Sequence, residues 1–160
     1  MSNPTRIMAV ASAGGHWVQL MRLRPSWAGM DVSYVSTDPG LEALLGTGAG
    51  QGIEASFKFY PVVDANRWTK MKLVKQLFQL LRIILATRPH VIITTGAAPG
   101  YFALRIGKMM GARTIWVDSI ANAEELSLSG QQARKFADLW LTQWQHLERP
   151  DGPEYKGSVI

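Results

Sequence analysis

The sequence has no cysteine among its 160 residues. This absence excludes a disulfide-based scaffold, a zinc site built on cysteine and a thiol nucleophile, and it is compatible with a reducing compartment. Charged residues make up only 18% of the chain and hydrophobic residues 47%, which excludes a disordered chain or a fibrous repeat. This length suits one domain with a sizeable core, so we expect residues 1–160 to form a single domain.

Long hydrophobic runs are missing as well. The longest, Leu73–Ala86, is interrupted by Lys75 and Arg82, whereas a membrane-spanning helix needs about 20 predominantly apolar residues. The run Ile7–Ala11 is too short for the core of a signal peptide and lacks a cleavage-type ending. We therefore expect a protein that is soluble or lies on a surface.

Acidic residues are scarce in one segment. The chain has 17 basic and 12 acidic residues, a net charge of +5. Residues 58–88 hold seven basic residues and one acid, Asp64, so this segment carries +6 and the remainder −1. The local excess indicates an anionic partner. Nucleic acid is disfavoured, because aromatic residues do not alternate with the basic ones in a stacking pattern.

Short apolar runs rich in β-branched residues alternate with helical patterns along the chain. The predicted strands are Ile7–Ala11, Val32–Ser36, Phe57–Val63, Val91–Thr95, Thr114–Asp118 and Leu139–Thr142. The predicted helices are Gly15–Leu23, Leu41–Leu45, Trp68–Thr87, Gly100–Met110 and a segment near Gln131–Phe136, and residues 46–52 are predicted to be a flexible loop. Continuously apolar strands that alternate with helices predict a Rossmann-like α/β domain with a parallel sheet covered on both faces.

Ligands of such sheets lie at the carboxyl ends of the strands, so the turns after the first, fourth and fifth predicted strands are the candidate sites. The first turn runs from Ser12 through Gly14 and Gly15 to His16. Glycines allow a ligand to approach the backbone, a helix N-terminus favours an anion, and histidine titrates near neutral pH. A tight turn with a solvated histidine is the simpler alternative.

The turn after the fourth strand, residues 94–101, is again rich in small residues, including Gly96. After the fifth strand, Asp118 and Ser119 provide a carboxylate and a hydroxyl. Asp118 is a candidate for orienting a sugar hydroxyl or acting as a base, and capping of the next helix is the commoner role of such a residue. We expect the first and fourth turns to face one crevice.

The predicted helix 68–87 is amphipathic. One face holds apolar residues (Val74, Leu77, Phe78, Leu81, Ile84 and Leu85, widened by Leu73 and Leu80), and the other holds Lys72, Lys75, Gln79 and Arg82. In one interpretation the helix packs in the core and its basic face is solvated. In the other it docks on an anionic membrane surface, with Arg67, Trp68, Lys70 and Met71 near the interface.

The ordered set of motifs resembles one family. It comprises Ser-x-Gly-Gly-His after the first strand, Thr-Gly after the fourth, Asp118-Ser119, the segment Leu126–Gly130, the segment Ala137–Trp144 and Tyr155-Lys156-Gly157. These are similar to the Alg-fourteen-like oligosaccharide-biosynthesis proteins, whose bacterial members include PssD-type capsule and exopolysaccharide proteins. The resemblance covers residues 7–157. The Gly-Gly-His turn alone is shared with MurG-like glycosyltransferases.

The resemblance implies half of an enzyme. Members correspond to the N-terminal, acceptor-binding domain of a GT-B glycosyltransferase, and a separate PssE-like partner holds the UDP-sugar, so no tightly bound cofactor and no metal are expected in this chain. The acceptor would be a saccharide on a polyprenyl pyrophosphate at the cytoplasmic face of the cell membrane, where the protein would be peripheral. Glucosaminyl, galactosyl and glucuronosyl transfer all fit the family.

Carried over to this sequence, Ser12, Gly14, Gly15 and Gly96 would bind the acceptor together with Ser119, and His16 or Asp118 would be the catalytic base. Two alternatives remain. One is a non-catalytic membrane-recruitment scaffold for a complete partner enzyme. The other is an unrelated Rossmann protein that binds a nucleotide by itself.

Overall fold

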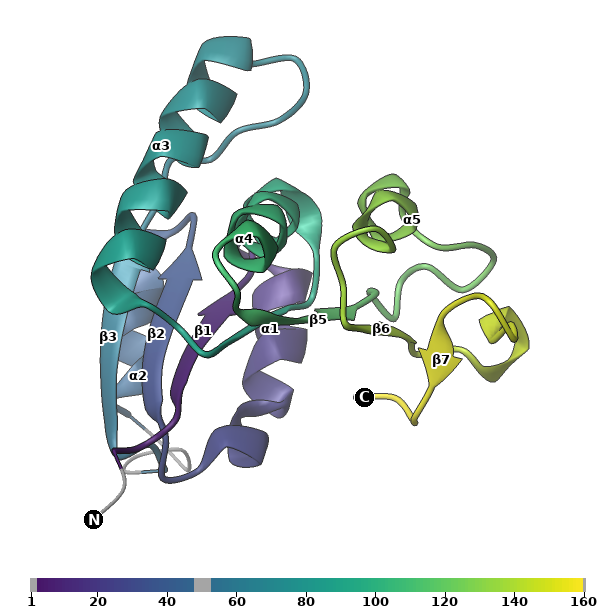
Figure 1. Cartoon of the computed structure of the whole chain (residues 1–160), viewed down its shortest axis with the longest axis horizontal. Coiled ribbons are helices and arrows are strands. Elements are labelled where there is room, and N and C mark those ends of the chain that lie inside the picture. Colours follow the sequence, from purple (N-terminus) through teal and green to yellow (C-terminus); the bar gives the residue numbers. More distant parts are fainter. Residues whose placement is uncertain (1–2, 48–52, 160) are drawn as a thin grey trace.

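A sheet of seven parallel strands forms the middle layer of the computed structural model, which describes residues 3–47 and 53–159 (Figure 1). The strand order is β3-β2-β1-β4-β5-β6-β7. The strands are β1 (Arg6–Val10), β2 (Asp31–Ser36), β3 (Ser56–Pro61), β4 (Val91–Thr94), β5 (Arg113–Val117), β6 (Leu139–Thr142) and β7 (Glu154–Tyr155). The predicted Rossmann-like α/β fold is confirmed.

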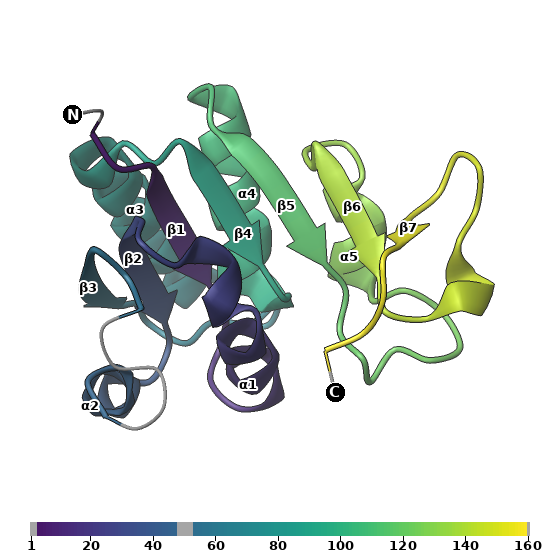
Figure 2. The same ribbon diagram turned by 90° about the horizontal axis from the view of Figure 1, so that it is seen from below.

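Helices cover both faces of the sheet (Figure 2). On one face lie α1 (Gly15–Arg22) and α2 (Glu42–Leu45), and on the other lie α3 (Lys70–Thr87), α4 (Ala97–Met109) and α5 (Leu128–Ala133). Short 3₁₀ turns span Arg24–Trp27, Pro39–Leu41 and Gln145–Leu147.

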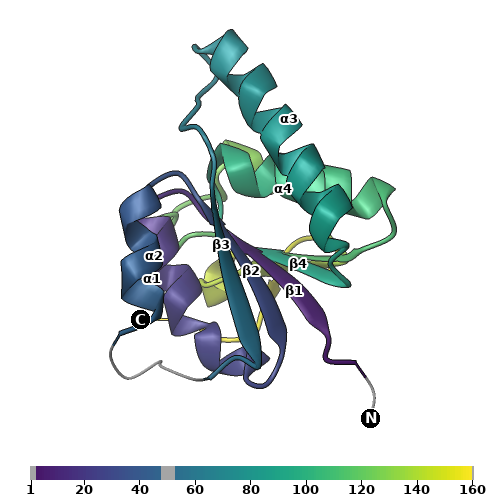
Figure 3. The same cartoon turned by 90° about the vertical axis from the view of Figure 1, so that its left-hand side faces the viewer.

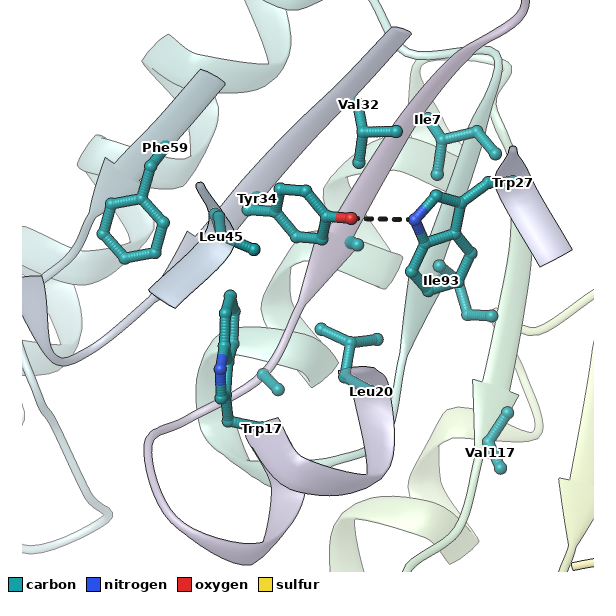
Figure 4. Close-up of a cluster of buried hydrophobic side chains, with 12 residues drawn as sticks. Ile7, Trp17, Leu20, Trp27, Val32, Tyr34, Leu45, Phe59, Ile93 and Val117 are labelled. Carbon is teal, nitrogen blue, oxygen red and sulfur yellow. Dashed lines mark hydrogen bonds between the residues drawn. The ribbon is translucent and has the colours of Figure 1, made fainter. Parts of the chain in front are cut away.

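Strand β1 shows why the apolar runs are continuous. Its side chains alternate between the two faces: Ile7 and Ala9 pack in the core beneath α1, and Met8 and Val10 pack in the core beneath α3 and α4. Figure 4 shows the first of these cores, in which the Trp27 indole donates to a tyrosine hydroxyl of β2 at 2.9 Å. Because both faces are buried from Ile7 to Val10, these four positions of β1 are apolar.

The strand order reverses between β1 and β4. The chain passes from β1 outward to β2 and β3, then returns across α3 to place β4 on the other side of β1. The connections that leave β1 and β4 therefore diverge to opposite faces of the sheet at its carboxyl edge, which is where ligands of doubly wound folds bind. The candidate turns after both strands lie at this edge.

The largest differences from the sequence prediction are the starts of two helices and one additional strand. Helix α4 begins at Ala97 rather than Gly100, because a proline at position 99 is tolerated in the first helical turn, where its missing N–H has no intrahelical partner. Helix α5 begins at Leu128 rather than near Gln131, because the Ser127 hydroxyl accepts from the amide of residue 130 and caps the helix. The short strand β7 was not predicted. Of the predicted loop 46–52, residues 48–52 lie outside the described part of the chain.

Helix α3 packs on the sheet with a different face from the one that the sequence predicted. Its buried side chains are Gln76, Leu80 and Ile84, and the amides of Gln76 and Gln79 bond the backbone of Val63. Most of the predicted apolar face points outward instead: Val74, Phe78, Leu81 and Leu85 are exposed. The interpretation that packs this apolar face in the core is wrong, because the buried Gln76, held by the Val63 carbonyl, rotates the packed face by about a quarter turn.

Figures 1 and 3 show the N-terminal half of α3 projecting beyond the carboxyl ends of the strands, away from the rest of the domain. Within residues 3–47 and 53–159, no helix combines the length and the apolar character needed to cross a bilayer.

Candidate functional site

The turns after β1 and β4 are joined by a reciprocal pair of hydrogen bonds. The His16 ring nitrogen Nδ1 lies 2.9 Å from the Thr95 carbonyl oxygen, and the Thr95 hydroxyl donates to the His16 carbonyl at 2.6 Å. The two residues are 79 positions apart in the sequence. The structure therefore brings the two turns into contact at the carboxyl edge of the sheet, and this contact confirms the part of the prediction that placed them together.

This contact determines the tautomer of His16. A carbonyl oxygen can only accept, so Nδ1 carries the proton that it donates to Thr95, and Nε2 of the neutral ring has a free lone pair. Nε2 makes no hydrogen bond to any residue that the structure describes, and the side chain is half-buried. An imidazole held in this way has the form that a general base requires.

Glycine at position 96 makes this packing possible. Gly96 has φ 127°, a region that favours glycine, and a Cβ built there would lie 2.9 Å from the His16 ring. The next residue, Ala97, also has a positive φ of 66°, which is strained for a residue with a side chain. The chain thus holds unfavourable backbone geometry where β4 leads into α4.

Two helices begin at this part of the carboxyl edge without side-chain caps. Gly14 precedes α1 and Gly96 precedes α4, and neither can supply a capping oxygen. Gly14 and Gly15 are exposed, and Ser12 is half-buried beside them. The uncapped N–H groups and the positive ends of two helix dipoles favour an anion, which is the chemistry of a phosphate site.

Asp118 is placed differently from His16. Its carboxylate is buried and accepts four hydrogen bonds: from Trp116 Nε1 (3.0 Å), Asn122 Nδ2 (3.0 Å), the Ser127 hydroxyl (2.7 Å) and the Ser127 amide (3.1 Å). Two donors reach each oxygen, so the acceptor capacity of the carboxylate is filled within the protein. This arrangement ties the loop after β5 to the start of α5.

Glycine at position 130 leaves room for that carboxylate. A Cβ at Gly130 would lie 2.8 Å from the Ser127 hydroxyl and closer still to Asp118 Oδ1. The Gly130 carbonyl accepts from Trp140 Nε1 at 2.9 Å, which ties α5 to β6. Packing around Asp118 therefore accounts for Ser127 and Gly130 of the Ser-Leu-Ser-Gly segment.

Ser119 joins the site through Gln19, a residue that the sequence analysis missed. The Gln19 amide group donates to the Ser119 hydroxyl (3.0 Å) and to the Gly15 carbonyl (3.3 Å), and it accepts from the Ile120 amide (2.9 Å) and Gln143 Nε2 (2.6 Å). Both glutamines are buried. Their network fixes α1, one turn after His16, against the loop after β5.

Nothing in the sequence pattern marks Gln19, because a glutamine on a short helix is usually solvated. Gln143 lies within the segment Ala137–Trp144, one of the motifs on which the family resemblance rests, so that motif already included one of the two glutamines. The predicted acceptor residues and His16 lie together at the carboxyl edge of the sheet, and Asp118 lies beneath the loop that borders this edge. The predicted membrane residues lie apart from them, on α3 and in the turn before it. They are all exposed: Arg67, Trp68, Lys70, Lys72, Lys75 and Arg82.

A second buried charged cluster lies under α1 and belongs to the scaffold. Arg24 donates two hydrogen bonds to Glu54 (2.6 and 3.0 Å) and one to the Leu45 carbonyl (3.0 Å), and the Tyr34 hydroxyl also donates to Glu54. Burial acts to raise the pKa of Glu54, but the bonds from Arg24 and Tyr34 outweigh it and leave that pKa lowered. Burial, reinforced by Glu54, raises the pKa of Tyr34. The cluster joins the 3₁₀ turn after α1 to the segment before β3.

The chain matches a known protein family. The family described as "Oligosaccharide biosynthesis protein Alg14 like" matches residues 61–159, which is more than half of the chain. The matched part begins at the end of β3 and includes α3, the turn after β4, the loop after β5 and α5.

Two curated fungal proteins are similar to this chain. The "UDP-N-acetylglucosamine transferase subunit ALG14" of Yarrowia lipolytica is 33% identical over 87 residues, which are 50% of this chain and 40% of that protein. The protein of the same name from Eremothecium gossypii is 26% identical over an alignment that covers 90% of this chain and 75% of that protein. The chain thus spans less than half of one relative and three quarters of the other.

Among solved structures, MurG of Acinetobacter baumannii superposes with a TM-score of 0.76 over 98% of this chain, at 14% sequence identity. The superposed part is 46% of the MurG chain. The likeness shows a shared fold over about half of the larger protein.

Proposed function

Because the chain belongs to the Alg14-like family of oligosaccharide-biosynthesis proteins, we propose that it is the acceptor-binding subunit of a two-component glycosyltransferase. The observation that carries the proposal is the junction of His16 with Thr95 at the reversal of strand order. It combines an oriented base and two helix N-termini at one edge, as transfer to a phosphorylated acceptor requires.

In the proposed reaction, His16 Nε2 removes the proton from an acceptor hydroxyl as that oxygen attacks the anomeric carbon of a UDP-sugar. The new glycosidic bond forms, the bond to UDP breaks, and the proton remains on the imidazole until solvent removes it. The Thr95 carbonyl supports this step, because the Nδ1–H that it accepts carries part of the positive charge that develops on the ring.

Ser12, Gly14 and Gly15 would bind the acceptor pyrophosphate at the start of α1, with Gly96 beside them. Ser119 would border the same site through its bond to Gln19. Of the two base candidates, we assign the role to His16. Asp118 already accepts four hydrogen bonds and is buried, so we assign it the positioning of the loop after β5.

The donor would be held mainly by a separate PssE-like subunit. Supporting this, the chain superposes on about half of MurG, and both fungal relatives carry the word "subunit" in their names. Those names also make UDP-N-acetylglucosamine the first donor to test. The acceptor would be a polyprenyl-pyrophosphate-linked saccharide in capsule or exopolysaccharide assembly, and the protein would be peripheral at the cytoplasmic face of the membrane.

The test is a reconstituted transfer assay. The chain, with and without its co-expressed partner, is given a polyprenyl-pyrophosphate-linked sugar in detergent and a panel of radiolabelled UDP-sugars, and label in the organic phase is counted. We expect transfer only when both proteins are present. His16→Ala should lower kcat by about 10²–10⁴-fold, the usual contribution of a general base.

His90→Ala is the matched control, because His90 is exposed at the amino edge, where its side chain accepts one hydrogen bond from the Arg6 amide. Its activity should stay within about twofold of wild type. Transfer by the partner alone would establish the scaffold alternative instead. Tight binding of a UDP-sugar or NAD by the lone chain would favour the independent nucleotide-binding alternative.

A further inference from the structure

Helix α3 presents an apolar strip to the outside of the domain. Its members recur three or four positions apart, which places them on one side of the helix: Met71 (88% exposed), Val74 (66%), Phe78 (60%), Leu81 (39%) and Leu85 (51%). We call these five residues the α3 strip. Over 18 residues the helix is about 27 Å long, so the strip is far more extensive than the isolated apolar side chains of an ordinary surface.

The charges around the α3 strip have one sign. Helix α3 contains no acidic residue, and its basic residues are Lys70, Lys72, Lys75 and Arg82. Lys70 borders the strip on one side and Lys75 and Arg82 on the other. The Arg82 guanidinium lies 5.9 Å from the centre of the Phe78 ring, so its stem covers apolar surface while its charge stays at the edge.

The turn before α3 continues this surface. Trp68 is 79% exposed, and the Arg67 guanidinium lies 4.8 Å from the centre of its ring. Asn66 fixes the turn: its side chain accepts from the Trp68 amide, and its own amide donates to the Thr69 hydroxyl, both at 3.0 Å. An exposed tryptophan in a firmly held turn is typical of residues that sit at the boundary between water and lipid.

We propose that the α3 strip and Trp68 lie in the surface of an anionic lipid bilayer, with Lys75, Arg82 and Lys70 on lipid phosphates. This rests on the proposed function and deepens its peripheral membrane association. It places in the bilayer the helix face that one of the two sequence interpretations had packed in the core. The side chains of Gln76 and Gln79 hold the helix to the domain, so the α3 strip is already ordered before binding. Binding therefore carries no entropy cost for folding the helix.

Charge decides between the bilayer and other occupants. A second copy of the chain would place one cationic helix against another with no acid on either, which is repulsive. Nucleic acid would leave the apolar centre of the strip in water. A bilayer with anionic headgroups satisfies both the apolar centre and the cationic edges.

The proposed orientation also suits the site. The projecting N-terminal half of α3 stands at the carboxyl edge of the sheet, where the His16 turn lies (Figures 1 and 3). A membrane contacted by α3 would therefore lie on the side of the domain where a lipid-linked acceptor has to enter.

The test is co-sedimentation of the full chain with vesicles, without donor or acceptor. The vesicles contain either phosphatidylcholine alone or phosphatidylcholine with phosphatidylglycerol. We expect binding to the anionic vesicles at least about tenfold tighter than to the neutral ones, weakened by salt. Val74→Ser with Phe78→Ser, and Lys75→Glu with Arg82→Glu, should each weaken binding by about tenfold or more.

Controls alter equally exposed residues elsewhere. Val18→Ser with Leu128→Ser removes two exposed apolar side chains outside α3, and Arg113→Glu with Lys135→Glu makes the same change in net charge. Both should bind as wild type does. Quenching of Trp68 fluorescence by brominated lipid, lost in Trp68→Phe, would locate the turn at the bilayer.

Three results would overturn the proposal. They are equal binding to neutral and anionic vesicles, wild-type binding by the variant with Val74→Ser and Phe78→Ser, and a loss of vesicle binding in the control variants as large as in the α3 variants. So would a wild-type dimer in sedimentation equilibrium that the Phe78 variant abolishes, because the strip would then join two copies. Since no step needs turnover, failure of the transfer assay leaves this test unaffected.

Discussion

The substitution Gly130→Ala is the strongest test of how the loop after β5 and the start of α5 pack around Asp118. Gly130 lies in the first turn of α5, where helix propensity alone favours alanine by up to about 1 kcal/mol. The added methyl group would lie 2.8 Å from the Ser127 hydroxyl and closer to Asp118 Oδ1, atoms that are held by hydrogen bonds and not free to rotate away. Helix propensity therefore predicts that Gly130→Ala stabilises the protein, whereas packing predicts that it destabilises the protein.

The magnitude follows from the two opposing effects. Overpacking a filled site costs about 1–3 kcal/mol, and displacing a buried carboxylate from one of its donors costs about 1–3 kcal/mol more. After subtraction of about 1 kcal/mol for the propensity gain, the free energy of unfolding should fall by roughly 1–5 kcal/mol. In a domain of this size that corresponds to a decrease in Tm of roughly 2–20 °C.

Urea unfolding followed by tryptophan fluorescence, together with a thermal melt by circular dichroism, would measure this change. Gly46→Ala is the control, because Gly46 has an ordinary φ of −85° and a Cβ there meets nothing within 4 Å. It should change stability by no more than about 0.5 kcal/mol. If Gly130→Ala is as stable as wild type or more so, the packing argument around Asp118 is wrong.

Two further predictions concern buried polar groups. Gln19→Leu should lower both stability and kcat, because it removes four hydrogen bonds one turn from His16. Gln76→Leu is the control, because it removes a buried glutamine of α3 and should lower stability alone. Equal kcat values in the two variants would refute a role of Gln19 in positioning His16. Glu54→Gln should cost roughly 3–5 kcal/mol at pH 7, because it leaves the buried Arg24 charge unpaired. The pKa of Glu54 is lowered in the folded protein, so its stabilisation is complete above the ordinary carboxyl range near pH ~4.3 and is lost as the pH falls below it. Urea unfolding should show the gap between wild type and Glu54→Gln narrowing in acid, and a constant gap down to pH ~3 would contradict the linkage.

The backbone fold could be predicted well because its signals are local. Strands β1 and β4 are apolar except at one end residue each, Arg6 and Thr94, and a glycine turn lies shortly after each strand. Their length and burial can therefore be predicted without knowledge of the partner strand. Boundaries were less predictable where a single side chain decides them, as Ser127 does for α5. The two-residue β7 has too few positions to show any period.

Half of the site could also be predicted. The Gly-Gly-His turn and Gly96 were recognisable because a parallel sheet brings its carboxyl ends together whatever the side chains are. The roles of Asp118 and Gln19 were not, because they depend on which donors surround a buried oxygen, and those donors come from elements far apart in the chain.

By itself, the sequence determined the alternation of strands and helices, the position of the glycine turns and the concentration of positive charge in residues 58–88. These properties depend on residues that are close along the chain. Only the tertiary structure decided that His16 donates to Thr95, that Asp118 is saturated by its neighbours, and that α3 turns Phe78 outward and Gln76 inward. A helix with apolar residues on more than half its circumference can pack in several rotations, and long-range contacts, such as the backbone of Val63 with Gln76, select one of them.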